Sequence, residues 1–188
     1  MTIILLNEYA KARVVFGKMT ESRQALGFLS GSIKASERQR LPLACSVALE
    51  VYIPRGARTD YGMLGLEWTG ASTGDVRISV RYDSENEPIW QESLAVALDE
   101  VRLGLPHEYA TAVLEEVVGG CLALPAGELR VCEAAHGRAG SSPALFSLIV
   151  VCALRMVGGE SRGDERLAAL IREVFGLRSS GSGGGNLG

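Results

Sequence analysis

Two groups of basic residues are the strongest candidates for chemistry in this chain. His136 and Arg138 lie two positions apart in the glycine-rich stretch of residues 135–140, and Arg55 and Arg58 lie in a second polar stretch. Imidazole and guanidinium groups on glycine-rich loops can approach a phosphate backbone closely and donate hydrogen bonds to it. These residue types therefore predict binding of an anionic partner. The competing interpretation is a pair of surface loops that are polar only because they face solvent.

The sequence shows no arrangement of residues that is typical of an enzyme or a metal site. It contains only two histidines, and its four cysteines form no CxxC pair and no metal-ligand spacing. Ser141 and Ser142 follow His136 closely, but their position directly before Pro143 is typical of a helix cap. We therefore expect a protein that is not an enzyme and that binds no metal and no other cofactor.

Composition limits the kinds of partner that the chain can have. It has 47% hydrophobic and 22% charged residues over 188 positions, a balance typical of one globular domain with appendages. The formal net charge of −3 excludes a global basic field, so any contact with RNA must be local. The cysteines fit reduced thiols, and neither a signal peptide nor a stretch of membrane-spanning length is recognisable. We expect a cytoplasmic protein with no membrane partner.

A helix, a strand, a loop and a second helix are predicted around His136 and Arg138. Apolar residues recur at three- and four-residue steps over residues 106–118, which predicts an amphipathic helix. Alternation over residues 129–132 predicts a half-buried strand, and the glycine-rich loop follows it. The next helix is apolar almost all round, so it should be the buried one.

The second basic pair lies at the turn of a predicted β-hairpin. Residues 45–53 alternate with apolar side chains at the odd positions, residues 54–60 form a polar turn, and residues 61–68 read as the returning strand. Residues 76–82 predict a third strand, and a further strand is expected around residues 94–98. These predicted strands, about four or five in number, and the two helices around the glycine-rich loop indicate an α+β protein.

The order of these pieces resembles domain IV of translation elongation factor G and its relatives, which include the tetracycline-resistance ribosomal protection proteins. Residues 106–113 match a P-x-E-Y-x-x-A-V helix start, and residues 124–127 are similar to a P-L-A-G turn. His136 then precedes paired serines and an apolar helix containing residues 144–146, Ala-Leu-Phe, where the family has A-F. The loop here lacks the acidic residues that the family places between the histidine and the serines.

The hairpin carries a second part of the resemblance. Residues 55–62 are similar to the family's glycine- and arginine-rich loop and the Q-Y-G that follows it, with Asp60 in place of the glutamine. The resemblance covers residues 44–157. It implies a mostly antiparallel sheet with two helices on one face and a left-handed βαβ core, with both loops near the tip of the domain.

The resemblance also implies a partner and a set of contact residues. In the family the tip enters the decoding region of the ribosome and touches tRNA and messenger RNA. By this resemblance the chain is expected to bind the ribosome, through ribosomal RNA or at a tRNA site, without catalysis. The expected RNA-binding residues on the tip loops are Arg55, Arg58, Tyr61, His136 and Arg138.

We divide the chain into four parts on these grounds. Residues 1–41 are expected to be an N-terminal extension and residues 42–157 the domain IV-like domain. Residues 158–177 carry a C-terminal amphipathic helix, which Asp164 can cap, and residues 178–188 are a Gly/Ser tail expected to be disordered. The Gly17-Lys18 pair lacks the remaining glycine and hydroxyl residues of a phosphate loop, so no GTP binding is expected.

Three classes of function stay open on the sequence alone. A basic cluster formed by Arg55, Arg58, His136 and Arg138 would favour RNA binding. An exposed apolar patch with dispersed arginines would instead favour a protein-interaction or regulatory module that keeps the fold without binding RNA. A deep pocket at residues 137–142 would favour a small-molecule enzyme, the weakest of the three.

Overall fold

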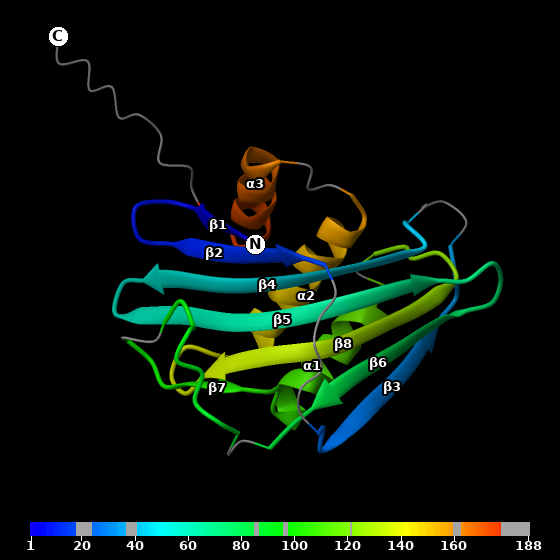
Figure 1. Ribbon diagram of the computed structural model, residues 1–188, viewed down its shortest axis with the longest axis horizontal. Helices are drawn as coiled ribbons and strands as arrows, with labels where there is room; N and C mark the ends of the chain where they lie inside the picture. Colours follow the sequence, from blue (N-terminus) through cyan, green and yellow to red (C-terminus); the bar gives the residue numbers. More distant parts are fainter. Residues whose placement is uncertain are drawn as a thin grey trace, which may run out of the picture.

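A computed structural model of the chain describes residues 1–17, 24–36, 41–84, 87–95, 98–120, 122–159 and 163–177. Within these residues eight strands and three helices are present (Figure 1). The strands are β1 (Thr2–Leu5), β2 (Lys11–Phe16), β3 (Gly27–Ile33), β4 (Ala44–Arg55), β5 (Arg58–Gly70), β6 (Val76–Tyr82), β7 (Val101–Leu103) and β8 (Gly127–Gly137). The helices are α1 (His107–Val118), α2 (Pro143–Val157) and α3 (Asp164–Val174). The predicted disordered tail, residues 178–188, lies outside the described residues.

All the described strands belong to one sheet in the order β1-β2-β4-β5-β8-β6-β3, with β7 pairing with β8 outside this path. The pairs are antiparallel except β6 and β8, which run parallel and are joined through α1. The predicted α+β class with a mostly antiparallel sheet is therefore confirmed. Residues 1–41, expected as an extension, supply β1 and β2 at one edge of this sheet and β3 at the other.

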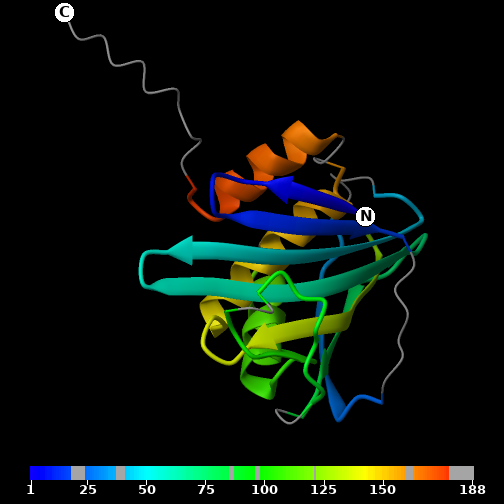
Figure 2. The same cartoon turned by 60° about the vertical axis from the view of Figure 1, so that its left-hand side comes forward.

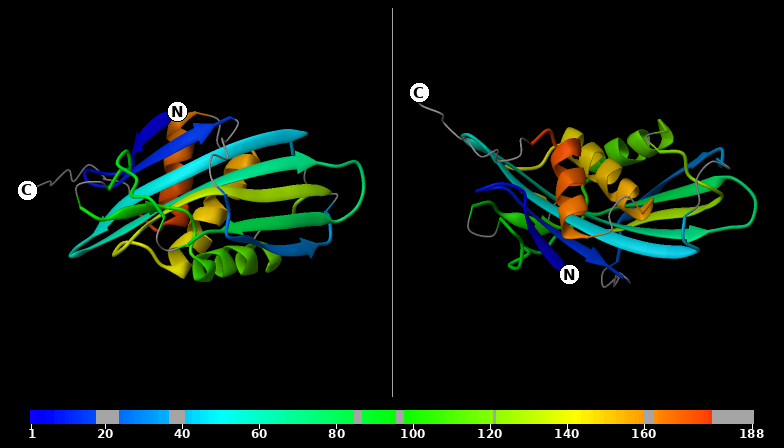
Figure 3. Two further views of the ribbon diagram at one scale, coloured as in Figure 1. Left: turned by 60° about the horizontal axis from the view of Figure 1, so that its bottom comes forward. Right: turned by 90° about the horizontal axis from the view of Figure 1, so that it is seen from above.

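The three helices lie on one face of the sheet (Figure 3). Alternation along the strands directs one set of apolar side chains towards these helices, and the main core forms between the two layers. The sequence predicted all three: α1 and α2 within the domain IV-like part, and α3 as the C-terminal amphipathic helix. α3 lies next to β1, where the Arg172 guanidinium donates to the carbonyl oxygens of Leu6 at 2.7 Å and Leu5 at 3.4 Å.

The segment of residues 87–103 crosses the opposite face of the sheet. A second apolar cluster forms beneath it, in which Ala95 and Val101 pack with Tyr52, Tyr61 and Met63. Residues 94–98 were expected to form a strand, but 94, 95 and 98 are in turns and 96–97 lie outside the described residues. The strand of this segment is β7, which begins only at Val101 because it pairs there with the end of β8.

α1 and α2 have the ends that the sequence indicated. α1 follows Pro106, and α2 begins at Pro143 with the Ser142 side chain accepting a hydrogen bond from the Leu145 N–H at 3.3 Å. α3 begins at Asp164, but its cap position is Gly163, so Asp164 lies in the first turn instead of capping the helix. No helix among the described residues has both the length and the apolar character needed to span a membrane.

The predicted strand at residues 129–132 is much longer in the structure. β8 continues to Gly137 because β5 pairs with it as far as His136 and β7 pairs with residues 135–137. A register shift in the pairing of β8 with β5, between Gly65 and Leu66 of β5, lets β8 stay paired with β5 over this length. His136 therefore lies on a strand, and the glycine-rich loop begins only at Arg138.

Candidate functional site

The two loops that carry the candidate arginines lie at the same end of the sheet (Figure 2). We call this region the loop end and define it as Arg55, Arg58, the β4–β5 turn between them, and residues 138–142. The Tyr61 N–H donates to the Gly140 carbonyl oxygen at 2.8 Å, and Ser141 Oγ donates to the Tyr61 carbonyl oxygen at 2.6 Å. The prediction that the two loops lie at one end is thus confirmed, and these hydrogen bonds hold the loop after β8 against β5, three residues beyond Arg58.

Asp60 offsets part of the positive charge of the hairpin turn. Its carboxylate accepts from Arg55 Nε at 2.7 Å and from Arg58 Nη2 at 3.1 Å. Arg55 also donates to the Phe175 carbonyl oxygen at 2.8 Å, which ties the residue after α3 to the hairpin. The Arg58 side chain keeps 72% of its surface exposed, so it is the better placed of the two arginines to meet a partner.

Tyr61 and His136 belong to the framework of the loop end. The Tyr61 ring is fully buried on the face covered by residues 87–103, and its hydroxyl donates to Glu50 Oε1 at 2.9 Å. His136 is 7% exposed, and its Nδ1 lies 3.0 Å from the Gly104 carbonyl oxygen. Its ring meets Tyr109 edge to face, with the ring centroids 6.1 Å apart. In this conformation neither ring is placed to stack on a base.

Arg138 is exposed at the start of the loop after β8. It borders an open hollow with a cavity volume of about 460 Å³, which Glu100, Arg102 and Glu108 also line. Arg102 is paired with Glu100 at 2.6 Å, so the hollow presents both signs of charge. Such a surface can bind a partner that offers both charges, or an anion that reaches the exposed guanidinium groups.

The sequence did not reveal the buried carboxylate beside this site. Glu50 is 2% exposed on β4, where its Oε1 accepts from the Leu94 N–H at 2.7 Å and its Oε2 lies 3.2 Å from Arg13 Nη1. It occupies a polar position in the alternating pattern of residues 45–53, which indicated a solvent-facing side chain. Burial raises the pKa of Glu50, and burial together with Glu50 raises the pKa of the Tyr61 hydroxyl.

This burial predicts a pH dependence of stability. Because the pKa of Glu50 is raised above its ordinary value of 4.5, the folded chain holds this proton at pH values where the unfolded chain has lost it. The stabilisation that the folded state gains from the protonated Glu50 is fully present below about pH 4.5. It is lost as the pH rises through the pKa of Glu50 in the folded chain. In Glu50→Gln the side chain does not titrate, so the wild type should lose free energy of unfolding relative to this variant as the pH rises. Urea unfolding of both proteins at pH 4 to 8 tests this, and a relative gain with pH would contradict it.

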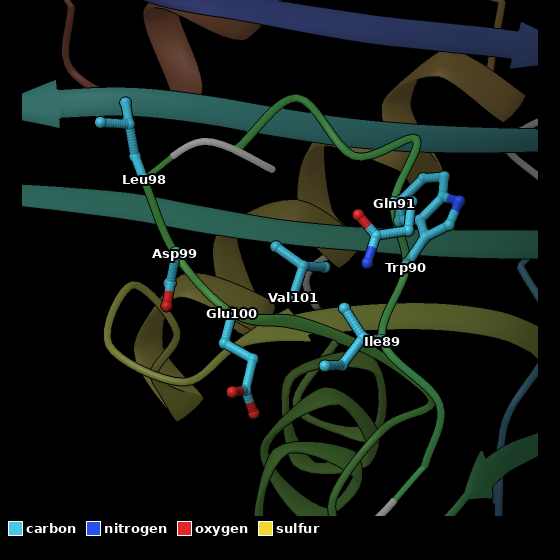
Figure 4. A pocket seen from close by; sticks show the side chains of 7 residues that line it. All are labelled: Ile89, Trp90, Gln91, Leu98, Asp99, Glu100 and Val101. Atoms are coloured by element: carbon cyan, nitrogen blue, oxygen red, sulfur yellow. The ribbon is translucent and has the colours of Figure 1, made fainter.

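Among the described residues, no group of three or more His, Cys, Asp or Glu side chains is placed to hold a metal ion. A second hollow, with a volume of about 390 Å³, is lined by residues 89–91 and 98–101 (Figure 4). Ile89 and Leu98 give it apolar surface, and Asp99 and Glu100 give it carboxylates.

Comparison with known proteins gives no relative for this chain. No protein-family model matches it, and no significant match was found among curated proteins or among solved structures.

Proposed function

We propose that this chain is a non-catalytic, cytoplasmic binding protein whose loop end contacts the phosphate backbone of RNA, at the ribosome or a tRNA site. The observation that carries the proposal is the joining of two arginine-bearing loops by Tyr61, which places Arg58 and Arg138 on the same end of the sheet. Guanidinium groups are the side chains best suited to bind phosphate oxygens. The chain is acidic overall, so such contacts would act at short range.

The proposed contact residues divide into two roles. Arg58 and Arg138 are exposed and would meet phosphate directly. Arg55, Tyr61 and His136 would position the loops, because they are held by Asp60, Glu50 and Gly104 respectively.

Part of the proposal concerns the type of fold. β6 and β8 are parallel neighbours, and the chain between them passes first through β7 and then through α1. We assign to the β6–α1–β8 unit the left-handed βαβ core of elongation factor G domain IV. Under this assignment the loop end of this chain corresponds to the tip of that domain. Because the tip touches RNA in the family, we favour RNA over other anions as the partner.

Ribosome binding tests the proposed function. The purified chain should pellet with ribosomes at low salt, and pelleting should weaken steeply as the salt concentration rises. Arg58→Glu/Arg138→Glu should abolish pelleting near physiological salt. The Arg58→Ala/Arg138→Ala variant should reduce the slope of log affinity against log salt by about 2, one for each lost phosphate contact. Arg55 is left unchanged, because it also holds Phe175.

The matched control is Arg77→Glu/Arg166→Glu, which makes the same change in net charge at exposed positions away from the loop end. This control should pellet more strongly than the loop-end variant. Absence of pelleting by the wild type at low salt, or equal loss in the two reversals, would refute RNA binding at the loop end.

A second candidate function rests on Asp60. Because this carboxylate pairs with Arg55 and Arg58, the hairpin turn has less positive charge than its sequence indicates. A mixed-charge surface rich in arginine is typical of a contact with another protein. The Asp60→Asn variant distinguishes the two functions. If the loop end binds RNA, loss of the Asp60 charge should strengthen pelleting with ribosomes and steepen its salt dependence. If the loop end binds a protein that contacts the Arg–Asp pairs, the variant should bind that protein less well.

A further inference from the structure

The loop after β8 binds a carboxylate of the same chain, that of Asp99. The backbone N–H of Ala139 donates to both Asp99 carboxylate oxygens, at 3.1 and 3.3 Å, and the Gly140 N–H donates to Oδ2 at 2.9 Å. Asp99 lies about forty residues earlier, on the segment that crosses the other face of the sheet. Figure 4 shows its carboxylate directed towards the loop after β8. Consecutive N–H groups that converge on one oxyanion form an anion-binding nest.

Gly137 at the end of β8 and Gly140 in the loop fit closely around the carboxylate. A Cβ atom added to Gly137 would lie 2.1 Å from Asp99 Oδ2, and one added to Gly140 would lie 3.0 Å from the same oxygen. At Gly137 the nearest atom to such a Cβ belongs to Asp99, so the bare backbone there provides the space that the carboxylate fills. The loop is therefore shaped around an oxyanion.

Asp99 is bound at the edge of the molecule and not in its core. The preceding residue, Leu98, is 71% exposed, and both residues border the open hollow of about 390 Å³. This hollow is the open space beside Asp99 into which its side chain would turn on leaving the loop. Arg138, the residue before these N–H groups, is exposed and favours negative charge at this place.

We propose that the Ala139 and Gly140 N–H groups form a phosphate-binding site and that Asp99 is an internal ligand that closes it. A phosphate group that carries two negative charges competes with one carboxylate for the same two donors, and Asp99 leaves when phosphate enters. The apparent affinity for phosphate is then reduced by the fraction of molecules in which Asp99 occupies the site. This inference is independent of the RNA proposal, because it concerns the loop itself and is tested with inorganic phosphate.

The test uses the ¹⁵N-labelled full chain and a titration with sodium phosphate at constant ionic strength. In Asp99→Ala the amide signals of Ala139 and Gly140 should shift in a saturable way, with an affinity about tenfold higher than in the wild type, the size expected when a charged competitor for two hydrogen bonds is removed. Glu100→Ala is the matched control, since the Glu100 carboxylate accepts from Arg102 whereas the Ala139 and Gly140 N–H groups donate to Asp99. It should behave as the wild type.

Asp99→Asn keeps the size of the side chain and one acceptor oxygen, so it preserves the loop if the alanine variant distorts it. Its phosphate affinity should lie between those of the wild type and Asp99→Ala. The proposal is overturned if neither variant shows a saturable shift at Ala139 and Gly140, or if Glu100→Ala gains as much affinity as they do. Because no RNA is present, a failure here is distinct from a failure of ribosome pelleting.

Discussion

Phe146→Ala is expected to lower the free energy of unfolding by about 3–5 kcal/mol, the typical cost of removing a fully buried phenylalanine side chain. Phe146 lies in the first turns of α2 with no exposed surface. Its ring stacks on Tyr109 of α1, with the centroids 5.1 Å apart and the planes 19° from parallel. The substitution leaves a cavity between the two helices and the sheet, and Tyr109 loses the ring on which it rests.

Phe28→Ala is the matched control for this prediction, because it makes the same change on the edge strand β3, where the ring is 53% exposed. It should cost about 0.5 kcal/mol or less. Urea unfolding followed by tryptophan fluorescence and circular dichroism measures both variants. Similar losses in the two variants would show that the ring of Phe146 does not lie in the core.

The helices and the long hairpin were predictable because their signals are local. α2 has a serine cap, a proline in its first turn and an almost continuous apolar surface, and the structure places all three as expected. The alternation over residues 45–53 predicted the middle of β4, and the polar turn after it indicated that the chain returns as a second strand, β5. These elements fix the positions of both arginine-bearing loops, and so their location at one end of the sheet could be foreseen.

The edge strand β3 and the short strand β7 could not be predicted in the same way. β3 contains two glycines, and β7 has only three residues, so neither shows a clear period. Each is a strand because of its partner, β6 for β3 and β8 for β7, and such pairing between distant segments leaves no local pattern. This is also why His136 was expected on a loop, although pairing with β7 extends β8 beyond it.

The candidate site was predicted in its residues but only in part in its geometry. The sequence indicated the arginines of the loop end, whereas the pairing of Arg55 and Arg58 with Asp60 depends on side-chain directions within the hairpin. The contacts of Glu50 and Asp99 were not foreseen at all. Both depend on how residues 87–103 cross the sheet, and a segment without periodicity gives no indication of its path.

Asp83→Ala is the second substitution with a large expected effect, a loss of about 3–5 kcal/mol in the free energy of unfolding, as is typical when one partner of a buried ion pair is removed. The carboxylate lies 2.7 Å from Arg81 Nη2, and the two side chains are 2% and 7% exposed. The Leu105 N–H also donates to Asp83 at 3.3 Å, while the Asp83 N–H donates to the Leu105 carbonyl oxygen at 2.8 Å. Asp83 thus fixes the chain just before α1 to the end of β6.

The control and a compensating variant decide whether the buried pair is the cause. Asp75→Ala removes the exposed partner of Lys34 and should change the free energy of unfolding by about 0.5 kcal/mol or less. Arg81→Met/Asp83→Leu replaces both charges by apolar groups and should recover much of the loss, because no charge then stays buried without its partner. Equal losses for Asp83→Ala and Asp75→Ala would contradict the buried pair. If the double variant does not recover stability, the loss is due instead to the hydrogen bond between Asp83 and Leu105. That hydrogen bond also positions the neighbouring Gly104, whose carbonyl oxygen contacts His136 beneath the loop end.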